Sequence, residues 1–353
     1  MAGDSACDAR RCGGSSTTDM VKRVLLWLLG IVVVLAVAVL LAFQLSPWPS
    51  VAIIQQLFSR GDQASEAALE KHVPADIVSR TDIAYGDGRD EIFDVNVPQG
   101  TEGALPTIVW VHGGGWVAGS KQGVANYLKV LTGYGYATVG LEYAHGFGVT
   151  YPGPVEQVNA ALGYLVANAA EYDINPDAII LAGDSAGAQI AAQVAILTTD
   201  PAYAQAIGMT PTLRAHQLRG VVLVSGAYDI ASADVDGEFG WLVRTVLWAY
   251  SGTKNFMSDA RFKLASITEN VSDVFPPAFV TSGNGDPLAP QAEALVERLQ
   301  ALGVETGSLF FPKDYEPVLP HEYQFNLDIE AGQQALQHML AFIGERVGHE
   351  ATN

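Results

Sequence analysis

The residue best suited to nucleophilic chemistry is Ser185, at the centre of the G-x-S-x-G run from Gly183 to Gly187. The apolar segment AIILAG precedes this run and an alanine-rich, helix-like segment follows it. In a strand–turn–helix context a sharp turn exposes the serine oxygen, and the two flanking glycines leave space that a Cβ would fill. Unpaired amides at the start of the helix also favour negative charge. The pattern therefore predicts a nucleophilic serine.

A serine hydroxyl needs a base that removes its proton and a carboxylate that orients the base. In this arrangement the chain order is serine, acid, histidine. The later histidines are His216, His321, His338 and His349. His338 falls inside the last predicted helix, His349 lies in the terminal tail, and His216 precedes a strand at the wrong edge of the sheet. His321 follows the last predicted strand and begins the last predicted helix, so we predict that it is the base.

The predicted acid is Asp286, in the run TSGNGDPLAP. It follows a buried strand directly, so we expect it at the sheet edge that carries Ser185. Asp229, after VSGAY, has a similar position one strand earlier and remains the alternative acid. Capping of the next helix is the structural alternative for Asp286.

Three consecutive glycines end another predicted strand, in VWVHGGGWVAGS (Val109 to Ser120). Acyl transfer develops a negative oxygen that backbone N–H groups stabilise from about 2.7–3.1 Å. We predict that Gly113 and Gly114 supply two such amides without side chains that obstruct the acyl group, and that Ala186 supplies a third. A simple tight turn is the alternative explanation for the glycines.

Strand-like and helix-like segments alternate along the chain and must position these residues. This alternation predicts an α/β fold, with a mostly parallel sheet covered by helices on both faces. It places one catalytic domain at 83–353, after a linker with N-terminal helices at 46–82 that can serve as a cap. The predicted strands are 107–111, 136–143, 178–183, 220–228, 278–283 and 307–311, after a strand–turn–strand at 83–97; the predicted helices are 53–58, 62–73, 122–133, 154–170, 186–197, 287–302 and 322–347.

Residues 230–277 form a long insertion between two of the predicted strands. It contains FGWLVRTVLWAY (239–250), whose apolar side chains recur at helical spacing. Connections of this length are usually lids or binding elements. We therefore predict a lid over the acyl pocket, with ordinary packing against the sheet as the alternative.

Residues Val24 to Leu45 form an apolar run with Gln44 as its one polar residue. This run reaches the ~20 residues that span a bilayer and exceeds the usual apolar stretch of a cleavable leader. We predict a retained transmembrane signal anchor at 21–45; a removed leader or a buried core helix are the alternatives. Basic residues before the span outnumber those after it, which predicts a cytoplasmic N-terminus and an extracytoplasmic catalytic domain. The preceding basic residues are Arg10, Arg11, Lys22 and Arg23, and Arg60 follows.

The composition limits the partners. Residues 1–20 are small and polar, which predicts a disordered cytoplasmic tail, and both cysteines, Cys7 and Cys12, fall in it. We expect free thiols there, with acylation as the alternative. The catalytic domain has no cysteine and cannot use disulfides. A net charge of −19 argues against nucleic acid as a partner, and no ligand pattern predicts a metal or cofactor.

The motifs together resemble those of the hormone-sensitive-lipase-type α/β-hydrolases, including bacterial carboxylesterases of the feruloyl-esterase-like group. The resemblance runs from roughly Ile83 to Val347 and includes YPGPVEQVNAAL and YDINPDAIILAGDSAG. It implies an α/β-hydrolase fold, with Ser185 as nucleophile, His321 as base and Asp286 as acid. The stretch EYAHGFGVTYPGP departs from the usual Tyr-Arg-Leu-Ala-Pro, which leaves the substrate preference open.

The resulting hypothesis is a membrane-anchored serine carboxylesterase that acts through an acyl-enzyme on a small-molecule or lipid ester. An acyltransferase or an amide or formamide hydrolase with the same triad are alternatives. An inactive hydrolase that serves as a binding module is a further alternative, although no triad member is missing.

Overall fold

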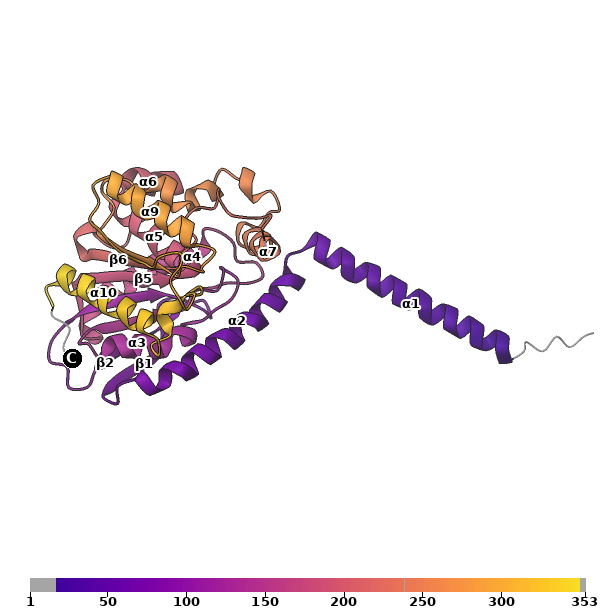
Figure 1. The fold of residues 1–353 in the computed structure, drawn as a ribbon, viewed down its shortest axis with the longest axis horizontal. Helices are drawn as coiled ribbons and strands as arrows, with labels where there is room; N and C mark the ends of the chain where they lie inside the picture. Colours follow the sequence, from indigo (N-terminus) through magenta and orange to yellow (C-terminus); the bar gives the residue numbers. More distant parts are fainter. Residues whose placement is uncertain (1–16, 238, 350–353) are drawn as a thin grey trace, which may run out of the picture. The chain divides into compact units, whose positions relative to one another are not determined.

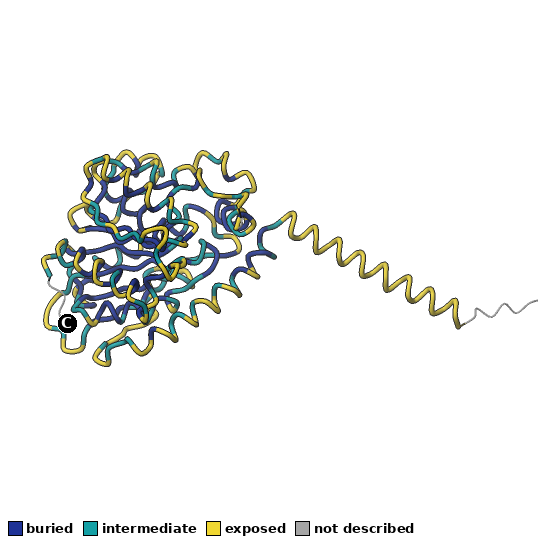
Figure 2. Tube along the Cα trace, in the orientation of Figure 1, coloured by how far each residue is buried: buried dark blue, intermediate teal, exposed yellow. Residues whose placement is uncertain are grey.

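The computed structural model describes residues 17–237 and 239–349, in two compact units, residues 1–49 and 50–353. The first unit contains helix α1 (Thr17–Leu45), whose residues are exposed along its whole length (Figure 2). It has 29 residues, and its most apolar 18-residue window has a mean hydropathy of 3.3. Both are sufficient for a membrane span, a test that a signal sequence also passes. The helix begins four residues before the predicted span, so residues 17–20 are helical. The rest of the predicted tail, with Cys7 and Cys12, lies outside the described residues.

Eight strands form one sheet in the described part of the second unit, in the order β1-β2-β4-β3-β5-β6-β7-β8 (Figure 1). Strand β2 pairs antiparallel with β1 and β4, and all other pairs are parallel. The predicted mostly parallel sheet is therefore confirmed. The strands are β1 (Ile77–Ala84), β2 (Ile92–Pro98), β3 (Leu105–Val111), β4 (Ala137–Leu141), β5 (Ile174–Asp184), β6 (Leu218–Val224), β7 (Ala278–Ser282) and β8 (Thr306–Phe310).

Helices cover both faces of this sheet. One face packs against α3 and α10 through Trp110, Ile180 and Val222, and Figure 1 shows α5 and α9 on the other side. Because the central strands are covered on both faces, consecutive residues such as Ile179, Ile180 and Leu181 are all fully buried. The helices of this unit are α2 (Trp48–Leu69, mostly in it), α3 (Ala125–Thr132), α4 (Gly153–Ala167), α5 (Ser185–Thr199), α6 (Pro201–Ile207), α7 (Gly240–Ser251), α8 (Ile267–Asn270), α9 (Ala289–Ala301) and α10 (Glu330–Val347).

Two helices differ from the prediction. The helices expected at 53–58 and 62–73 are one continuous helix, α2. An exposed glycine, Gly61, costs a helix about 1 kcal/mol, which the buried side chains of Val51, Ile54 and Leu69 outweigh. The last helix begins at Glu330 instead of 322. Residue 322 has a φ of 58°, and a 3₁₀ turn follows at 323–325. Asn326 and Ile329 then have ψ of 88° and 149°, outside the right-handed helical region.

Candidate active site

Ser185 lies at a sharp turn between β5 and α5. Its φ is 50°, a left-handed conformation that a non-glycine residue rarely adopts. A Cβ on Gly183 would lie 2.6 Å from the backbone of Gly187, and a Cβ on Gly187 would lie 2.1 Å from the carbonyl oxygen of Val111. Both glycines are therefore required by close backbone contacts, and the turn exposes the serine side chain.

The structure brings the three predicted triad residues together in one hydrogen-bonded line. His321 Nε2 lies 3.0 Å from Ser185 Oγ, and His321 Nδ1 lies 2.9 Å from Asp286 Oδ2. Asp286 is held in place because its Oδ2 accepts from Ser282 Oγ and its Oδ1 from the amide of Leu288. His321 lies in the loop after β8 and precedes a short 3₁₀ turn, so it does not begin the last helix as predicted.

The electrostatics of this line favour an ionised acid. Burial raises the pKa of Asp286, but the hydrogen bond and charge of His321 outweigh it and leave the pKa below its usual value. Burial lowers the pKa of His321, but nearby carboxyl groups, first Glu322 and then Asp286, raise it to about 9. The carboxylate of Asp286 therefore stabilises a proton on the imidazole.

The alternative residues lie elsewhere. Asp229 Oδ1 accepts from the amide of Ala231 and so caps a turn. His216 is exposed and lies 3.5 Å from Asp177. His338 is exposed on α10, and the ring of His349 packs on that of Tyr136.

The loop after β3, which contains Gly113, Gly114 and Gly115 and is called the glycine loop below, differs from the prediction in which amides are available as donors. The amide of Gly113 donates to Asp184 Oδ2 at 2.8 Å, so it already has an acceptor and is not available to an oxyanion. Among the hydrogen bonds of residues 17–237 and 239–349, none uses the amides of Gly114, Gly115 or Ala186. A Cβ on Gly114, whose φ is 111°, would lie 2.1 Å from the carbonyl oxygen of Ala118. Gly114 is thus required by loop packing, and Gly115 offers an amide that the sequence analysis passed over.

Buried polar side chains hold this loop. His112 Nδ1 bonds the carbonyl of Gly113, and His112 Nε2 bonds Glu142 Oε1 at 3.1 Å. Burial lowers the pKa of His112, but Glu142 outweighs it and raises the pKa. His145 Nε2 bonds the carbonyl of Gly119 at 3.0 Å. Ligand atoms of His112, Glu142 and His145 lie within 4.8 Å of one another. The hydrogen bonds above engage both nitrogens of His112 and Nε2 of His145, whereas the buried Nδ1 of His145 has no partner among the described residues.

A cavity of about 560 Å³ contains the exposed side of the triad. Ser185, His321 and Gly114 line one side of it, and α2 forms another wall. That wall contains apolar side chains, Leu57 and Phe58, next to polar ones. Part of the segment 46–82, for which a cap was predicted, therefore lines the cavity. Its α2 wall consists of Leu57, Phe58, Gly61, Asp62, Ser65 and Ala68.

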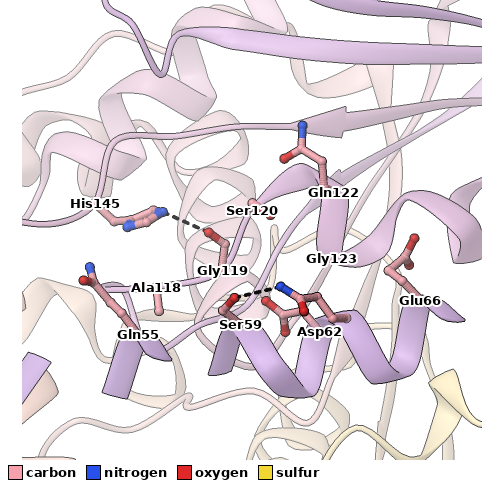
Figure 3. A pocket seen from close by; sticks show the side chains of 11 residues that line it. Gln55, Ser59, Asp62, Glu66, Ala118, Gly119, Ser120, Gln122, Gly123 and His145 are labelled. Carbon is pink, nitrogen blue, oxygen red and sulfur yellow. Dashed lines mark hydrogen bonds between the residues drawn. The ribbon is translucent and has the colours of Figure 1, made fainter. Parts of the chain in front are cut away.

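A second cavity of about 470 Å³ lies beside the first (Figure 3). The two share the lining residues Asp62, Gly119, Ser120 and Gly123. Figure 3 shows α2 along one side and the 118–123 loop with His145 along the other. The spacing of 4, 3 and 4 residues places four polar side chains on one face of α2. These are Gln55, Ser59, Asp62 and Glu66.

The insertion 230–277, predicted as a lid, contacts the glycine loop. Of the described residues of the insertion 230–277, none lines either cavity. Instead Tyr250 of α7 stacks on Trp116 with ring centroids 4.9 Å apart, and a Cβ on Gly115 would lie 3.3 Å from Val246 Cγ1. The insertion thus supports the glycine loop. Trp241, 54% exposed, lies outside this contact.

Sequence reasoning also missed Glu322, which lines the larger cavity beside His321. The signal in the sequence that could have indicated Glu322 is its position directly after the predicted base, His321. Its contacts with Asp184 and Ser225 are non-local and could not be inferred from spacing.

Comparisons with known proteins find relatives that are named as esterases. Esterase LipQ of Mycobacterium tuberculosis is 28% identical over 219 residues, which cover 61% of this chain and 50% of LipQ. An esterase of Gibberella moniliformis is 27% identical over 252 residues, 67% of this chain and 75% of that protein. An acetyl esterase of Salmonella agona is 26% identical over 273 residues, 73% and 77% of the two chains. The match thus spans about half the length of LipQ and about three quarters of the other two.

Solved structures confirm the fold. Esterase B from Lactobacillus rhamnosis superposes with a TM-score of 0.73 at 21% identity, over 84% of this chain and 95% of that one. A bacterial heroin esterase gives 0.67 at 21% identity, over 86% and 96%. The predicted α/β-hydrolase fold is confirmed. The resemblance to hormone-sensitive-lipase-type hydrolases is confirmed by the matching family model and the relatives named as esterases. The BD-FAE family model matches residues 93–299, more than half of the chain. The chain therefore belongs to the BD-FAE family.

Proposed function

We propose that the protein is a membrane-anchored serine carboxylesterase that hydrolyses carboxylic esters through an acyl-enzyme. The observation that carries this proposal is the hydrogen-bonded line from Ser185 Oγ through His321 to Asp286, at the wall of a cavity large enough for a small ester. The esterases among its relatives support ester hydrolysis.

The positions of Ser185 and His321 suggest the steps of ester hydrolysis. Ser185 Oγ attacks the ester carbonyl carbon while its proton passes to His321 Nε2. The amides of Gly114 and Ala186, which have no other acceptor among the described residues, donate to the oxyanion. The bond to the alcohol oxygen breaks, and His321 gives its proton to the departing alcohol. Water then attacks the acyl-enzyme in the same way. Its proton passes to His321 while its oxygen attacks the acyl carbon, the bond from that carbon to Ser185 Oγ breaks, and His321 returns the proton to Ser185.

We assign the anchor to α1, with the N-terminus in the cytoplasm and the catalytic domain on the other side. The apolar length of the helix supports a span, and the basic residues before it support this orientation. The substrate is then an ester that reaches the extracytoplasmic side.

A second candidate function is acyl transfer to an alcohol other than water. The second cavity favours it, because polar side chains of α2 line it and a hydroxylated acceptor could bind there, next to the catalytic cavity. Product analysis with and without added glycerol separates the two: transfer gives a glycerol ester, and hydrolysis gives free acid alone.

The test of the proposed hydrolysis compares the wild type with Ser185→Ala and His321→Ala on phenyl acetate. Both variants should lose activity about 10⁴-fold or more, because triad members act as a unit. Near-normal activity in either variant contradicts the proposal.

A further inference from the structure

Glu322 brings a second carboxyl group to the imidazole of His321. Its Oε1 lies 3.5 Å from His321 Nε2, the atom that also faces Ser185 Oγ. Asp286 instead bonds Nδ1, at the other edge of the ring. The proposed triad uses only Asp286, so it leaves Glu322 unexplained.

The backbone of Glu322 is held in a strained conformation. Its φ is 58°, and its amide donates to Ser225 Oγ at 3.2 Å. Ser225 is fully buried and is itself strained, with a φ of 49°. Strain of this kind persists only where the surroundings enforce it, and it clusters at functional sites.

The side chain of Glu322 lies beside the buried residue Asp184. A Cβ on Gly113 would lie 2.3 Å from Asp184 Oδ2 and 3.1 Å from Glu322 Oε1, so the two carboxyl groups approach the same point of the glycine loop. Burial, and after it the charge of Glu322, raise the pKa of Asp184 to about 8. Trp110 Nε1 and the amide of Gly113 hold Asp184 in turn, at 2.6 and 2.8 Å.

We propose that Glu322 is a positioning residue for the reaction: with its backbone held by Ser225, its carboxylate holds the Nε2 edge of His321 and stabilises the imidazolium that forms when Ser185 attacks. This inference rests on the proposed esterase function. It assigns His321 one carboxylate at each edge of the ring.

Other titratable groups also lie around His321. Asp286, from the loop after β7, bonds its ring, and Asp184, from the strand before the nucleophile, lines the cavity. The remaining groups that line the cavity lie on α2, on the glycine loop and in the segment before α10; they are Asp62, His112, Tyr323 and Asp328. Of all these, Glu322 and Asp286 are the carboxyl groups within 4 Å of the imidazole nitrogens.

The pH dependence of activity tests the role of Glu322. Burial lowers the pKa of His321, and Glu322 is the first of the groups that raise it, to about 9. His321 can accept the proton of Ser185 only when it is neutral, so activity should be lost as the pH falls through this pKa. Removal of the Glu322 charge lowers the pKa and moves the acid limb of the profile to lower pH.

The experiment measures kcat/KM and kcat of the full-length protein on phenyl acetate between about pH 5 and about pH 10. Glu322→Gln keeps the shape of the side chain and removes its charge. We expect the acid limb to shift down by about one pH unit or more, and kcat on the high-pH plateau to fall more than KM rises. Glu330→Gln removes an exposed carboxylate eight residues later and should leave the limb in place.

An unshifted limb in Glu322→Gln overturns the proposal, as does an equal shift in Glu330→Gln. If Glu322→Gln does not fold, Glu322→Ala must show the same shift. The outcomes also separate the two proposals. Absence of hydrolysis in the wild type contradicts the proposed function, whereas an active variant with an unchanged profile contradicts only the role of Glu322.

Discussion

The amide of Gly113 donates to the carboxyl group of Asp184 at 2.8 Å, which ties the glycine loop to the residue before the nucleophile. Asp184 is 3% exposed and also accepts from Trp110 Nε1. This contact joins the end of β3 to the end of β5. It fixes the distance between the proposed oxyanion donors and Ser185.

Replacement of Asp184 by alanine should destabilise the domain. Asp184→Ala leaves two buried donors, the amide of Gly113 and Trp110 Nε1, without an acceptor, at about 1–3 kcal/mol each. We expect the free energy of unfolding to fall by about 3 kcal/mol in urea titrations. Asp328→Ala, which removes an exposed carboxylate paired with Lys71, is the control and should change it little. If both variants lose the same free energy of unfolding, the buried contact of Asp184 does not stabilise the domain more than an exposed ion pair does.

Gly114 and Gly115 should respond differently to alanine. A Cβ on Gly114 would overlap the backbone of Ala118, whereas a Cβ on Gly115 meets Val246 Cγ1 at 3.3 Å, where a side chain can adjust. Gly114→Ala should therefore displace an oxyanion donor and lower kcat about 100-fold or more. Gly115→Ala should have a smaller effect on kcat. If Gly114→Ala keeps the wild-type kcat, its amide does not take part in the reaction.

The apolar part of the α2 wall should set the acyl-chain preference. Phe58 lines the cavity, and its removal opens space for longer chains. Phe58→Ala should raise the ratio of kcat/KM for hexanoate over acetate esters about tenfold. Trp241→Ala is the matched control, because this exposed aromatic residue lines neither cavity, and its ratio should stay at the wild-type value. The reverse pattern would support the predicted lid in the insertion 230–277.

The membrane topology can be tested on intact cells. A protease applied outside the cytoplasmic membrane should digest the catalytic domain and spare an epitope tag at Met1, because the basic residues precede the span. A digested tag with a protected domain would reverse the orientation. Release of the domain in soluble form without protease would instead indicate a cleaved leader.

Local patterns in the sequence were enough to predict part of this site. Gly183 and Gly187 serve contacts within a single strand–turn–helix unit, so their spacing is a local signal. Asp286 and His321 were predicted because strands of a parallel sheet bring their carboxyl ends to one edge. The alternation of strands and helices predicted the sheet for a similar reason.

Other features depend on contacts that the sequence does not encode locally. The continuity of α2 depends on burial of Val51 and Leu69, which outweighs the cost of Gly61. The hydrogen bond of the Gly113 amide depends on the carboxyl group of Asp184, which is 71 residues away in the sequence. The role proposed for Glu322 depends on a left-handed backbone, which glutamate rarely adopts and periodicity does not indicate.

The most direct test of the proposed mechanism is the intact mass of the protein, quenched in acid during turnover of phenyl acetate, followed by mapping of the modified peptide. We predict one acetyl group per chain, located on Ser185, which disappears in Ser185→Ala and is strongly reduced in His321→Ala, since the base is needed for attack. Acetylation of another residue, or an acetyl group that persists in Ser185→Ala while hydrolysis continues, would contradict the assignment of Ser185 as the nucleophile.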